Sequence, residues 1–221
     1  MREVAPIAAS LKHLVFLPTS AGKNFPTIIA MHGRGADEKD LAPVVLALEI
    51  PDLLLVTPRA PFAFPYGGYA WYELGQDGVP APETFQTSVG LIRKFIEEIK
   101  VGYPADPKQV ILLGFSQGTM MAYATALVNP SMFRGIAALS GYVPYRSNSP
   151  LRLSNLTGFP VFISHGSNDP IIPVRLGRET AKLLMDAGAS VTYHEYLMGH
   201  EIREDTIRDL KQWVLKVLQP A

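Results

Sequence analysis

Short apolar runs alternate along the chain with longer segments in which apolar residues recur at helical spacing. Several of the short runs are apolar at every position, as in residues 110–113, which is typical of strands covered on both faces in a parallel sheet. This pattern predicts seven strands, at Leu14–Leu17, Thr27–Met31, Leu53–Thr57, Val110–Gly114, Ile136–Ser140, Pro160–Ser164 and Val191–Tyr196.

The segments between these strands predict helices. In Glu83–Val101 the apolar residues form one stripe with charged residues opposite, and Gln117–Val128 is almost wholly apolar or small, as expected of a buried helix. Further helices are predicted at Glu38–Glu49, Pro173–Ala187 and Glu201–Leu218. Because strand and helix alternate, we expect an α/β fold with a mostly parallel central sheet and helices on both faces.

Residues 58–82 break this alternation. They contain five prolines, four glycines and six aromatic residues. A loop of this length inside a compact domain is usually functional or disordered, and the aromatic content argues against disorder. We interpret it as the wall or lid of a substrate pocket. The alternative is a packed excursion that covers one end of the sheet.

The composition excludes several classes of protein. The 221 residues correspond to a single domain, residues 1–221, with no large cap domain. Lys and Arg number 20, and Asp and Glu number 20, so the net charge is zero and no basic footprint for nucleic acid is present. The absence of cysteine excludes disulfide scaffolds, zinc–thiolate sites and a cysteine nucleophile.

The N-terminal segment and the length of the apolar runs indicate where the protein is located and whether it inserts into a membrane. Residues 1–10 do not resemble a signal peptide, and no stretch of about 18 apolar residues occurs. We therefore expect a cytoplasmic protein with no stable insertion into a membrane. The neutral charge and the aromatic loop are compatible with a homodimer.

A serine lies where a nucleophile is expected. An apolar strand is followed by Gly-Phe-Ser-Gln-Gly at residues 114–118 and then by a helix. A serine on such a sharp turn projects its hydroxyl above the sheet, and the following helix N-terminus favours developing negative charge. This context predicts Ser116 as the nucleophile rather than an incidental serine in a structural turn.

A serine nucleophile needs a general base and a carboxylate that orients the base, and here they should follow in the order Ser, acid, His. Asp169 lies in a loop after the strand Pro160–Ser164, and His200 lies in a loop after Val191–Tyr196. The alternative for Asp169 is a helix cap or a turn. His32 and His165 also end strands, and we expect structural hydrogen bonds from them. The histidines lack the spacing of a metal site, so we expect no metal and no cofactor.

Acyl transfer also needs donors aimed at the tetrahedral oxygen. One is expected from the backbone N–H of Gln117, directly after the nucleophile. The other is expected from the loop after Thr27–Met31, which reads His-Gly-Arg-Gly at residues 32–35. Its two glycines suit a backbone that approaches the substrate closely, and the spacing fits no phosphate-binding loop.

These motifs, in this order and at these separations, resemble the phospholipase/carboxylesterase family of α/β-hydrolases, which includes acyl-protein thioesterases and small bacterial carboxylesterases. The resemblance covers roughly residues 25–217. It implies an α/β-hydrolase fold, Ser116, Asp169 and His200 as the triad, and the backbone N–H groups of Arg34 and Gln117 as oxyanion donors. Two positions differ from the family pattern, since Thr119 and Glu73 stand where glycine and aspartate are common.

The expected activity is that of a serine carboxylesterase acting on small-molecule esters with short- to medium-chain acyl or aryl groups. The alternatives are acyl-protein thioesterase or lysophospholipase activity, or a non-catalytic ligand-binding protein on a hydrolase scaffold. The aromatic loop is predicted to line the substrate pocket, with the residues Phe62, Phe64, Tyr69, Trp71 and Tyr72.

Overall fold

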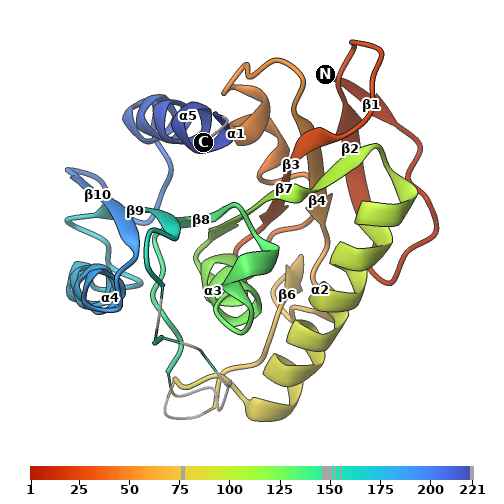
Figure 1. Ribbon diagram of the computed structural model, residues 1–221. Coiled ribbons are helices and arrows are strands. Elements are labelled where there is room, and N and C mark those ends of the chain that lie inside the picture. Colours follow the sequence, from red (N-terminus) through yellow and green to blue (C-terminus); the bar gives the residue numbers. More distant parts are fainter. Residues whose placement is uncertain (76–77, 146–150, 152, 155, 220–221) are drawn as a thin grey trace.

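The computed structural model describes residues 1–75, 78–145, 151, 153–154 and 156–219, and within them the main sheet has eight strands in the order β1-β2-β4-β3-β7-β8-β9-β10 (Figure 1). Neighbouring strands from β4 to β10 are parallel, whereas β2 and β1 are added antiparallel at one edge. The strands of this sheet are β1 (Arg2–Val4), β2 (His13–Leu17), β3 (Phe25–Met31), β4 (Leu54–Pro58), β7 (Ala105–Phe115), β8 (Gly135–Leu139), β9 (Pro160–Gly166) and β10 (Ser190–Tyr196).

Helices cover both faces of the sheet. The helices α1 (Ala42–Leu46) and α5 (Glu204–Leu218) lie on one face, and α2 (Pro82–Gly102), α3 (Gln117–Ala126) and α4 (Val174–Asp186) lie on the other (Figure 1). A short 3-10 helix, η1 (Pro130–Met132), connects α3 to β8. The predicted fold class, a mostly parallel sheet between two helical layers, is confirmed.

The core is divided by the sheet into two apolar clusters. Successive residues of a strand point to opposite faces, so Ile28 and Ile111 pack with α1 and α5, while Ile29 and Leu112 pack with α2, α3 and α4. All four of these side chains are fully buried. This double coverage explains why the central strands are apolar at every position.

All seven predicted strands are present, but one predicted helix is much shorter than expected. Instead of Glu38–Glu49, the helix spans only Ala42–Leu46. The preceding residues form a turn in which the N–H of Lys39 donates to Asp37 Oδ1 at 2.8 Å. Glu38 is turned inward and buried, which a solvent-facing position in a helix would not allow.

The aromatic loop folds back on the sheet. It contains a small two-stranded sheet of β5 (Phe62–Ala63) and β6 (Tyr69–Ala70), and it ends where α2 begins. Trp71 and Tyr72 are buried completely, with exposed fractions of 0% and 1%. Of the predicted loop 58–82, residues 76–77 lie outside the described residues.

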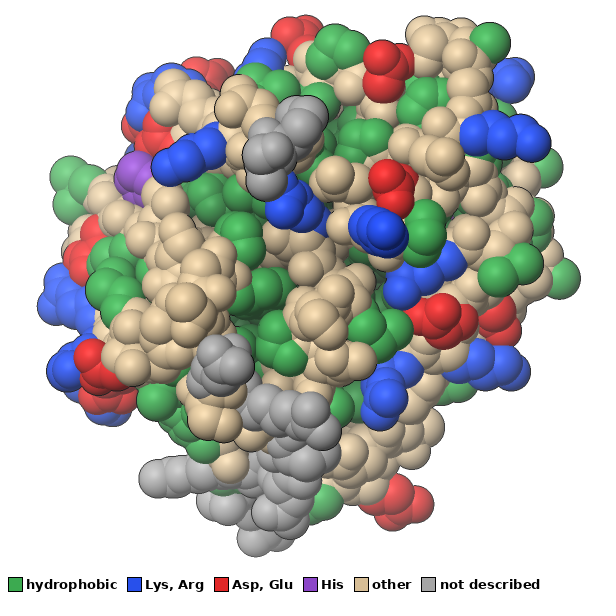
Figure 2. Space-filling model, in the orientation of Figure 1, with side chains coloured by type: hydrophobic (Ala, Val, Ile, Leu, Met, Phe, Trp, Pro, Cys, Tyr) green, Lys and Arg blue, Asp and Glu red, His purple; other side chains and the backbone are tan. Residues whose placement is uncertain are grey.

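The surface carries no single sign of charge on the face seen in Figure 2. Hydrophobic side chains are exposed near the middle of this face, and acidic and basic side chains are interspersed around them (Figure 2). This mixture agrees with the zero net charge. In the described part of the chain, none of the helices combines the length and the apolar character that crossing a membrane requires.

The turn from β7 into α3 depends on very close backbone packing. A Cβ atom on Gly118 would lie 1.9 Å from the carbonyl oxygen of Met31, and one on Gly114 would lie 2.3 Å from the backbone of Gly118. Neither contact is possible for a side chain, so glycine is required at both positions. These contacts set the first turn of α3 directly against the end of β3.

We expect Gly118→Ala to lower the free energy of unfolding by about 3 kcal/mol or more, because the methyl group overlaps backbone that cannot move aside. The matched control is Gly90→Ala on α2, where a Cβ meets nothing within 4 Å. This control should stabilise the protein by about 0.5–1 kcal/mol. Urea unfolding of both variants tests the account, and equal effects of the two substitutions would contradict it.

Candidate active site

Ser116 occupies a strained turn at the end of β7. Its backbone angles are φ 53° and ψ −119°, and it is the residue immediately before α3. A positive φ is uncommon for a residue other than glycine and costs about 1–3 kcal/mol, so the surrounding structure must hold it. The N–H of Ser116 donates to the carbonyl oxygen of Leu139 on β8 at 2.9 Å, which helps to do so.

Thr119, one of the two positions that differ from the family pattern, also supports this turn. Its buried hydroxyl oxygen lies 2.7 Å from the carbonyl oxygen of Gly114 and 2.8 Å from that of Leu139. It also accepts the N–H of Leu139 at 3.2 Å. The threonine thus ties the start of α3 to the ends of β7 and β8, on both sides of Ser116.

Asp169 and His200 meet at the same edge of the sheet. The imidazole Nδ1 of His200 lies 2.7 Å from Asp169 Oδ2. The other carboxylate oxygen, Oδ1, accepts the N–H groups of Ile171 and Ile172, each at 2.8 Å. Asp169 thus stabilises its own turn through Oδ1 and contacts His200 through Oδ2, as the predicted orienting carboxylate would.

The surroundings keep Asp169 ionised. Burial by itself raises the pKa of this carboxyl, but the hydrogen bonds from His200 and from two backbone N–H groups outweigh burial, and the net pKa is lowered. The carboxylate is therefore charged at neutral pH. It is suited to hold one imidazole tautomer and to stabilise the imidazolium form.

The loops that carry Asp169 and His200 are fixed to each other by their backbones. The N–H of Ser167 donates to Tyr196 O at 2.8 Å, and the N–H of Asn168 donates to Met198 O at 3.1 Å. A Cβ on Gly166 would lie 2.1 Å from Gly199 O, so only glycine permits this approach. The two side chains are thus held together by the ends of adjacent parallel strands β9 and β10.

The structure places His200 beside the strand end that carries the serine. The imidazole ring of His200 packs on the ring of Phe115, with centroids 4.8 Å apart. In the described part of the chain, no hydrogen bond joins His200 to the hydroxyl of Ser116.

The loop after β3 lies directly over Ser116. A Cβ on Gly33 would be only 3.4 Å from the Cβ of Ser116. The backbone N–H groups of Arg34 and Gln117 have no acceptor among the described residues. Two unpaired donors beside a serine hydroxyl are what an oxyanion requires.

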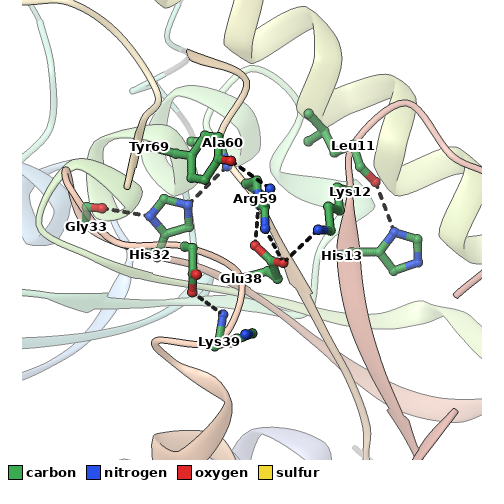
Figure 3. A network of polar contacts seen from close by, with 11 residues as sticks. Leu11, Lys12, His13, His32, Gly33, Glu38, Lys39, Arg59, Ala60 and Tyr69 are labelled. Atoms are coloured by element: carbon green, nitrogen blue, oxygen red, sulfur yellow. Dashed lines mark hydrogen bonds and ion pairs between the residues drawn. The ribbon is translucent and has the colours of Figure 1, made fainter. Parts of the chain in front are cut away.

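His32 is a structural residue of this loop, as expected. Its Nδ1 donates to Gly33 O at 2.7 Å, and its Nε2 accepts the N–H of Ala60 at 3.0 Å (Figure 3). The tautomer follows from these partners. Burial lowers the pKa of His32, which keeps the ring neutral. The indole N–H of Trp71 donates to His32 O at 2.8 Å, so the aromatic loop is fastened to the same point.

The side chain of Gln117 fastens the aromatic loop from the other side. Its amide oxygen accepts the N–H of Trp71 at 2.8 Å, and its amide nitrogen donates to Tyr72 O at 2.8 Å. Buried Ser88 on α2 donates to Trp71 O. Trp71 therefore has its backbone and indole groups fully engaged in holding two loops together.

A buried ion pair anchors the far end of the loop after β3. The guanidinium of Arg59 forms a two-pronged contact with the carboxylate of Glu38, with one N–O distance of 2.6 Å (Figure 3). Arg59 also donates to the hydroxyl of Tyr69 at 2.8 Å and lies over its ring. The N–H of Gly35 donates to Tyr69 O, and the N–H of Tyr69 donates to Ala36 O, each at 2.8 Å. Glu38, Arg59 and Tyr69 thus form a clamp on the loop that carries Arg34, and we call them the loop clamp.

A cavity of about 210 Å³ opens beside Ser116. Its walls come mainly from α3, α4 and the segments before them, and its apolar lining includes Met120, Ile172, Pro173 and Leu176. Arg34, Gln117, Tyr72 and Tyr142 complete much of the remaining wall. A cavity of about 400 Å³ between α2 and α3 is larger, but its lining contains none of the predicted site residues.

The predicted pocket residues are divided by the structure. Tyr72 lines the cavity beside Ser116, whereas Phe62, Phe64, Tyr69 and Trp71 are not among its lining residues. Trp71 and Tyr69 instead hold the loop after β3, and Phe64 packs beside Gly35 on that loop. Trp71, Tyr69 and Phe64 therefore support the loop after β3, and a direct role of these residues and of Phe62 in binding substrate stays a prediction.

Sequence reasoning missed the apolar residues that do line the cavity. Ile172 and Pro173 directly follow the Asp169 loop, and Met120 lies four residues after Ser116, one helical turn away. Their position next to Asp169 and Ser116 in the sequence is the signal that points to the cavity.

The strained serine, the histidine–carboxylate pair and the mostly parallel sheet define a serine hydrolase of the α/β-hydrolase type. Residues 15–218 match the family model described as Phospholipase/Carboxylesterase, and the chain belongs to this family.

Among relatives, the chain is 28% identical to acyl-protein thioesterase 1 of Mycosarcoma maydis, over 94% of this chain and 98% of that protein. Two solved structures have the same fold. The carboxylesterase of Bacillus cereus gives a TM-score of 0.81 at 25% identity, covering 94% of this chain and 95% of its own. Esterase PE8 gives a TM-score of 0.82 at 26% identity, and the match covers 96% of this chain and 100% of the esterase.

We expect Glu38→Gln to lower the free energy of unfolding by about 2–4 kcal/mol, because it leaves the charge of Arg59 without a partner in a mostly buried site. The control is Glu179→Gln, which removes an exposed ion pair with Arg175 and should cost no more than about 0.5 kcal/mol. Urea unfolding at neutral pH measures both. Equal costs would show that the loop clamp does not stabilise the fold.

The contribution of Glu38 should also depend on pH. Burial raises the pKa of Glu38, but its hydrogen bonds with Arg59 and backbone prevail, and the net pKa is lowered. Stabilisation is therefore complete above the unfolded pKa of about 4.3 and is lost as the pH falls through the lower folded value. The difference in stability between wild type and Glu38→Gln should shrink in that acidic range. A difference that stays constant there would contradict this assignment.

Proposed function

We propose that the protein is a serine carboxylesterase that hydrolyses short- to medium-chain acyl or aryl esters through Ser116, His200 and Asp169. The observation that carries the proposal is the 2.7 Å contact between His200 Nδ1 and a buried, ionised Asp169, next to a serine held at positive φ. The positive φ of Ser116, between a strand and a helix, is the backbone geometry expected of a nucleophile that projects above the sheet, which supports the proposal.

The reaction proceeds in two halves. The hydroxyl oxygen of Ser116 attacks the ester carbonyl carbon while its proton passes to Nε2 of His200. The N–H groups of Arg34 and Gln117 donate to the oxyanion, and His200 returns the proton to the leaving alcohol as the C–O bond breaks. Water then attacks the acyl-serine carbonyl and gives a proton to His200. His200 returns this proton to the Ser116 oxygen as the acyl–oxygen bond breaks, which releases the carboxylic acid and the free serine.

The size and lining of the cavity support a small substrate. Its volume of about 210 Å³ is below the roughly 300–1,000 Å³ of sites for drug-sized ligands. Met120, Ile172 and Leu176 offer an apolar surface to an acyl or aryl group. A short acyl chain can be enclosed there, whereas a long chain must extend past the exposed Leu74 and Ile171 at the rim.

Two alternatives remain. Thioesterase activity is favoured by the relative that is named an acyl-protein thioesterase, and lysophospholipase activity by the family description Phospholipase/Carboxylesterase; both would use the same triad on a different substrate. A non-catalytic ligand-binding protein would keep the pocket but would show no burst of product. Parallel assays of esters and thioesters with the same acyl group separate these possibilities. A cytoplasmic location and a homodimeric state stay predictions.

We expect Ser116→Ala to reduce kcat by about three to six orders of magnitude, because the nucleophile is removed. Asp169→Asn should reduce kcat by about 10³–10⁴-fold, since an amide favours the wrong imidazole tautomer. Steady-state hydrolysis of para-nitrophenyl butanoate measures both. The control is Ser131→Ala, an exposed serine on η1, which should keep wild-type kcat. Near-normal turnover in Ser116→Ala would refute the triad.

We expect kcat/KM on para-nitrophenyl esters to peak between butanoate and hexanoate and to fall at least about tenfold for palmitate, because the cavity encloses only a short chain. Narrowing the cavity with Leu176→Trp should move the optimum towards acetate. A wild-type optimum at palmitate, unaffected by Leu176→Trp, would show that the acyl chain binds elsewhere.

A further inference from the structure

The cavity beside Ser116 carries a single charged side chain among its described lining residues. That residue is Arg34, which follows Gly33 in the loop over the serine. The rest of the described lining is apolar or neutral and polar, and Asp169 is not part of it. A cation in the wall of this cavity can contact a ligand if no protein partner already occupies it.

Arg34 forms no ion pair with any residue that the structure describes. In the described residues its guanidinium has neither a carboxylate within ion-pair distance nor a hydrogen-bond acceptor, in contrast to Arg59 on the loop clamp. Its five N–H donors are therefore available. Arg34 is exposed at the mouth of the cavity, where a ligand can reach it.

Two aromatic rings locate this charge. The guanidinium lies over the ring of Phe64, 5.4 Å from its centroid, which is within cation–π range. The charge of Arg34 also acts on Tyr72 in the cavity wall. Burial raises the pKa of the Tyr72 hydroxyl, and the positive charge of Arg34 partly offsets this rise. A contact with the face of the Phe64 ring uses none of the guanidinium's N–H donors as conventional hydrogen bonds, so they can still bind a planar anion.

The helices around the cavity add to the positive potential. Both α3 and α4 begin at its wall, and neither has an acidic residue in its first turn. Helix N-termini carry partial positive charge, and an apolar wall strengthens electrostatic attraction within the cavity. The N-terminus of α3 serves the proposed oxyanion of any ester, whereas the Arg34 guanidinium and the N-terminus of α4 would in addition favour a substrate that carries its own negative charge.

We propose that Arg34 determines specificity, and that the preferred substrates are esters bearing a carboxylate or phosphate a few bonds from the scissile carbonyl. This inference rests on the proposed esterase function. The short reach follows from the chain itself, because the guanidinium and the proposed oxyanion donor belong to the same residue. Arginine pairs with such groups through two parallel hydrogen bonds, which fixes the orientation of the ester over Ser116.

Two pairs of esters of matched shape test which side of the ester carries the anion. Monoethyl succinate and ethyl isocaproate differ in whether the acyl group ends in a carboxylate or in an isopropyl group. Butanoyloxyacetate and isobutyl butanoate make the same comparison on the alcohol side. In at least one of the two pairs, we expect kcat/KM of the anionic ester to exceed that of its neutral partner by at least about tenfold.

The variants then assign that preference to Arg34. Arg34→Gln should reduce the ratio of anionic to neutral kcat/KM by at least about tenfold, and Arg34→Glu should reverse it. Salt at about 0.5 M should weaken the wild-type preference, because the charge is exposed. The control Lys39→Gln removes an exposed charge from the same loop outside the cavity and should leave the ratio unchanged. A wild-type ratio near one, or a ratio that Arg34→Gln does not alter, overturns the proposal.

Binding to an inactivated protein separates this inference from the proposed function. In the Ser116→Ala background, calorimetric titration should show tighter binding of the preferred anionic ester than of its neutral partner, and Arg34→Gln should abolish the difference. Selective binding without turnover in the wild type would support the anion site and refute the esterase. Turnover that depends on the triad, without selective binding of the anionic ester, would support the esterase and refute the anion site.

Discussion

The active-site architecture depends on one backbone constraint, the sharp turn at Ser116 between β7 and α3. The turn exists because Gly114 and Gly118 let the first turn of α3 approach β3 within distances that any side chain would prevent. That approach brings the loop after β3 over the serine. Thr119 and the bond from Ser116 N–H to Leu139 then hold the serine at a positive φ.

The remaining groups reach the same place through the sheet. Carboxyl ends of parallel strands meet at one edge, so Asp169 after β9 and His200 after β10 lie together although 31 residues separate them. The bonds between their loops, and the close approach at Gly166, make this pair a rigid unit. The strand order therefore brings Asp169 and His200 to the same edge of the sheet, and the short loops after β9 and β10 fix the positions of their side chains.

The apolar runs predict the sheet, and the order of Gly-Phe-Ser-Gln-Gly, Asp169 and His200 predicts that these residues lie at one edge of it, where Asp169 and His200 are in contact. Their roles as a catalytic triad stay a prediction. Local patterns carry this information because apolar periodicity and turn chemistry act over few residues. Which side chains of the aromatic loop face the cavity and which face the protein interior cannot be predicted in this way. Whether Trp71 faces ligand or protein depends on partners such as His32 and Gln117, which are distant in the sequence. The same holds for Glu38, which looked like a helical surface residue and is buried against Arg59.

The most direct test of the central claim is to identify the residue that reacts with a fluorophosphonate, by mass spectrometry of peptides from the labelled protein. The account predicts one adduct per chain, on Ser116, formed much more slowly in Asp169→Asn because an activated serine hydroxyl is the group that attacks phosphorus. The absence of an adduct, or an adduct on a different residue at a rate unaffected by Asp169→Asn, would contradict it.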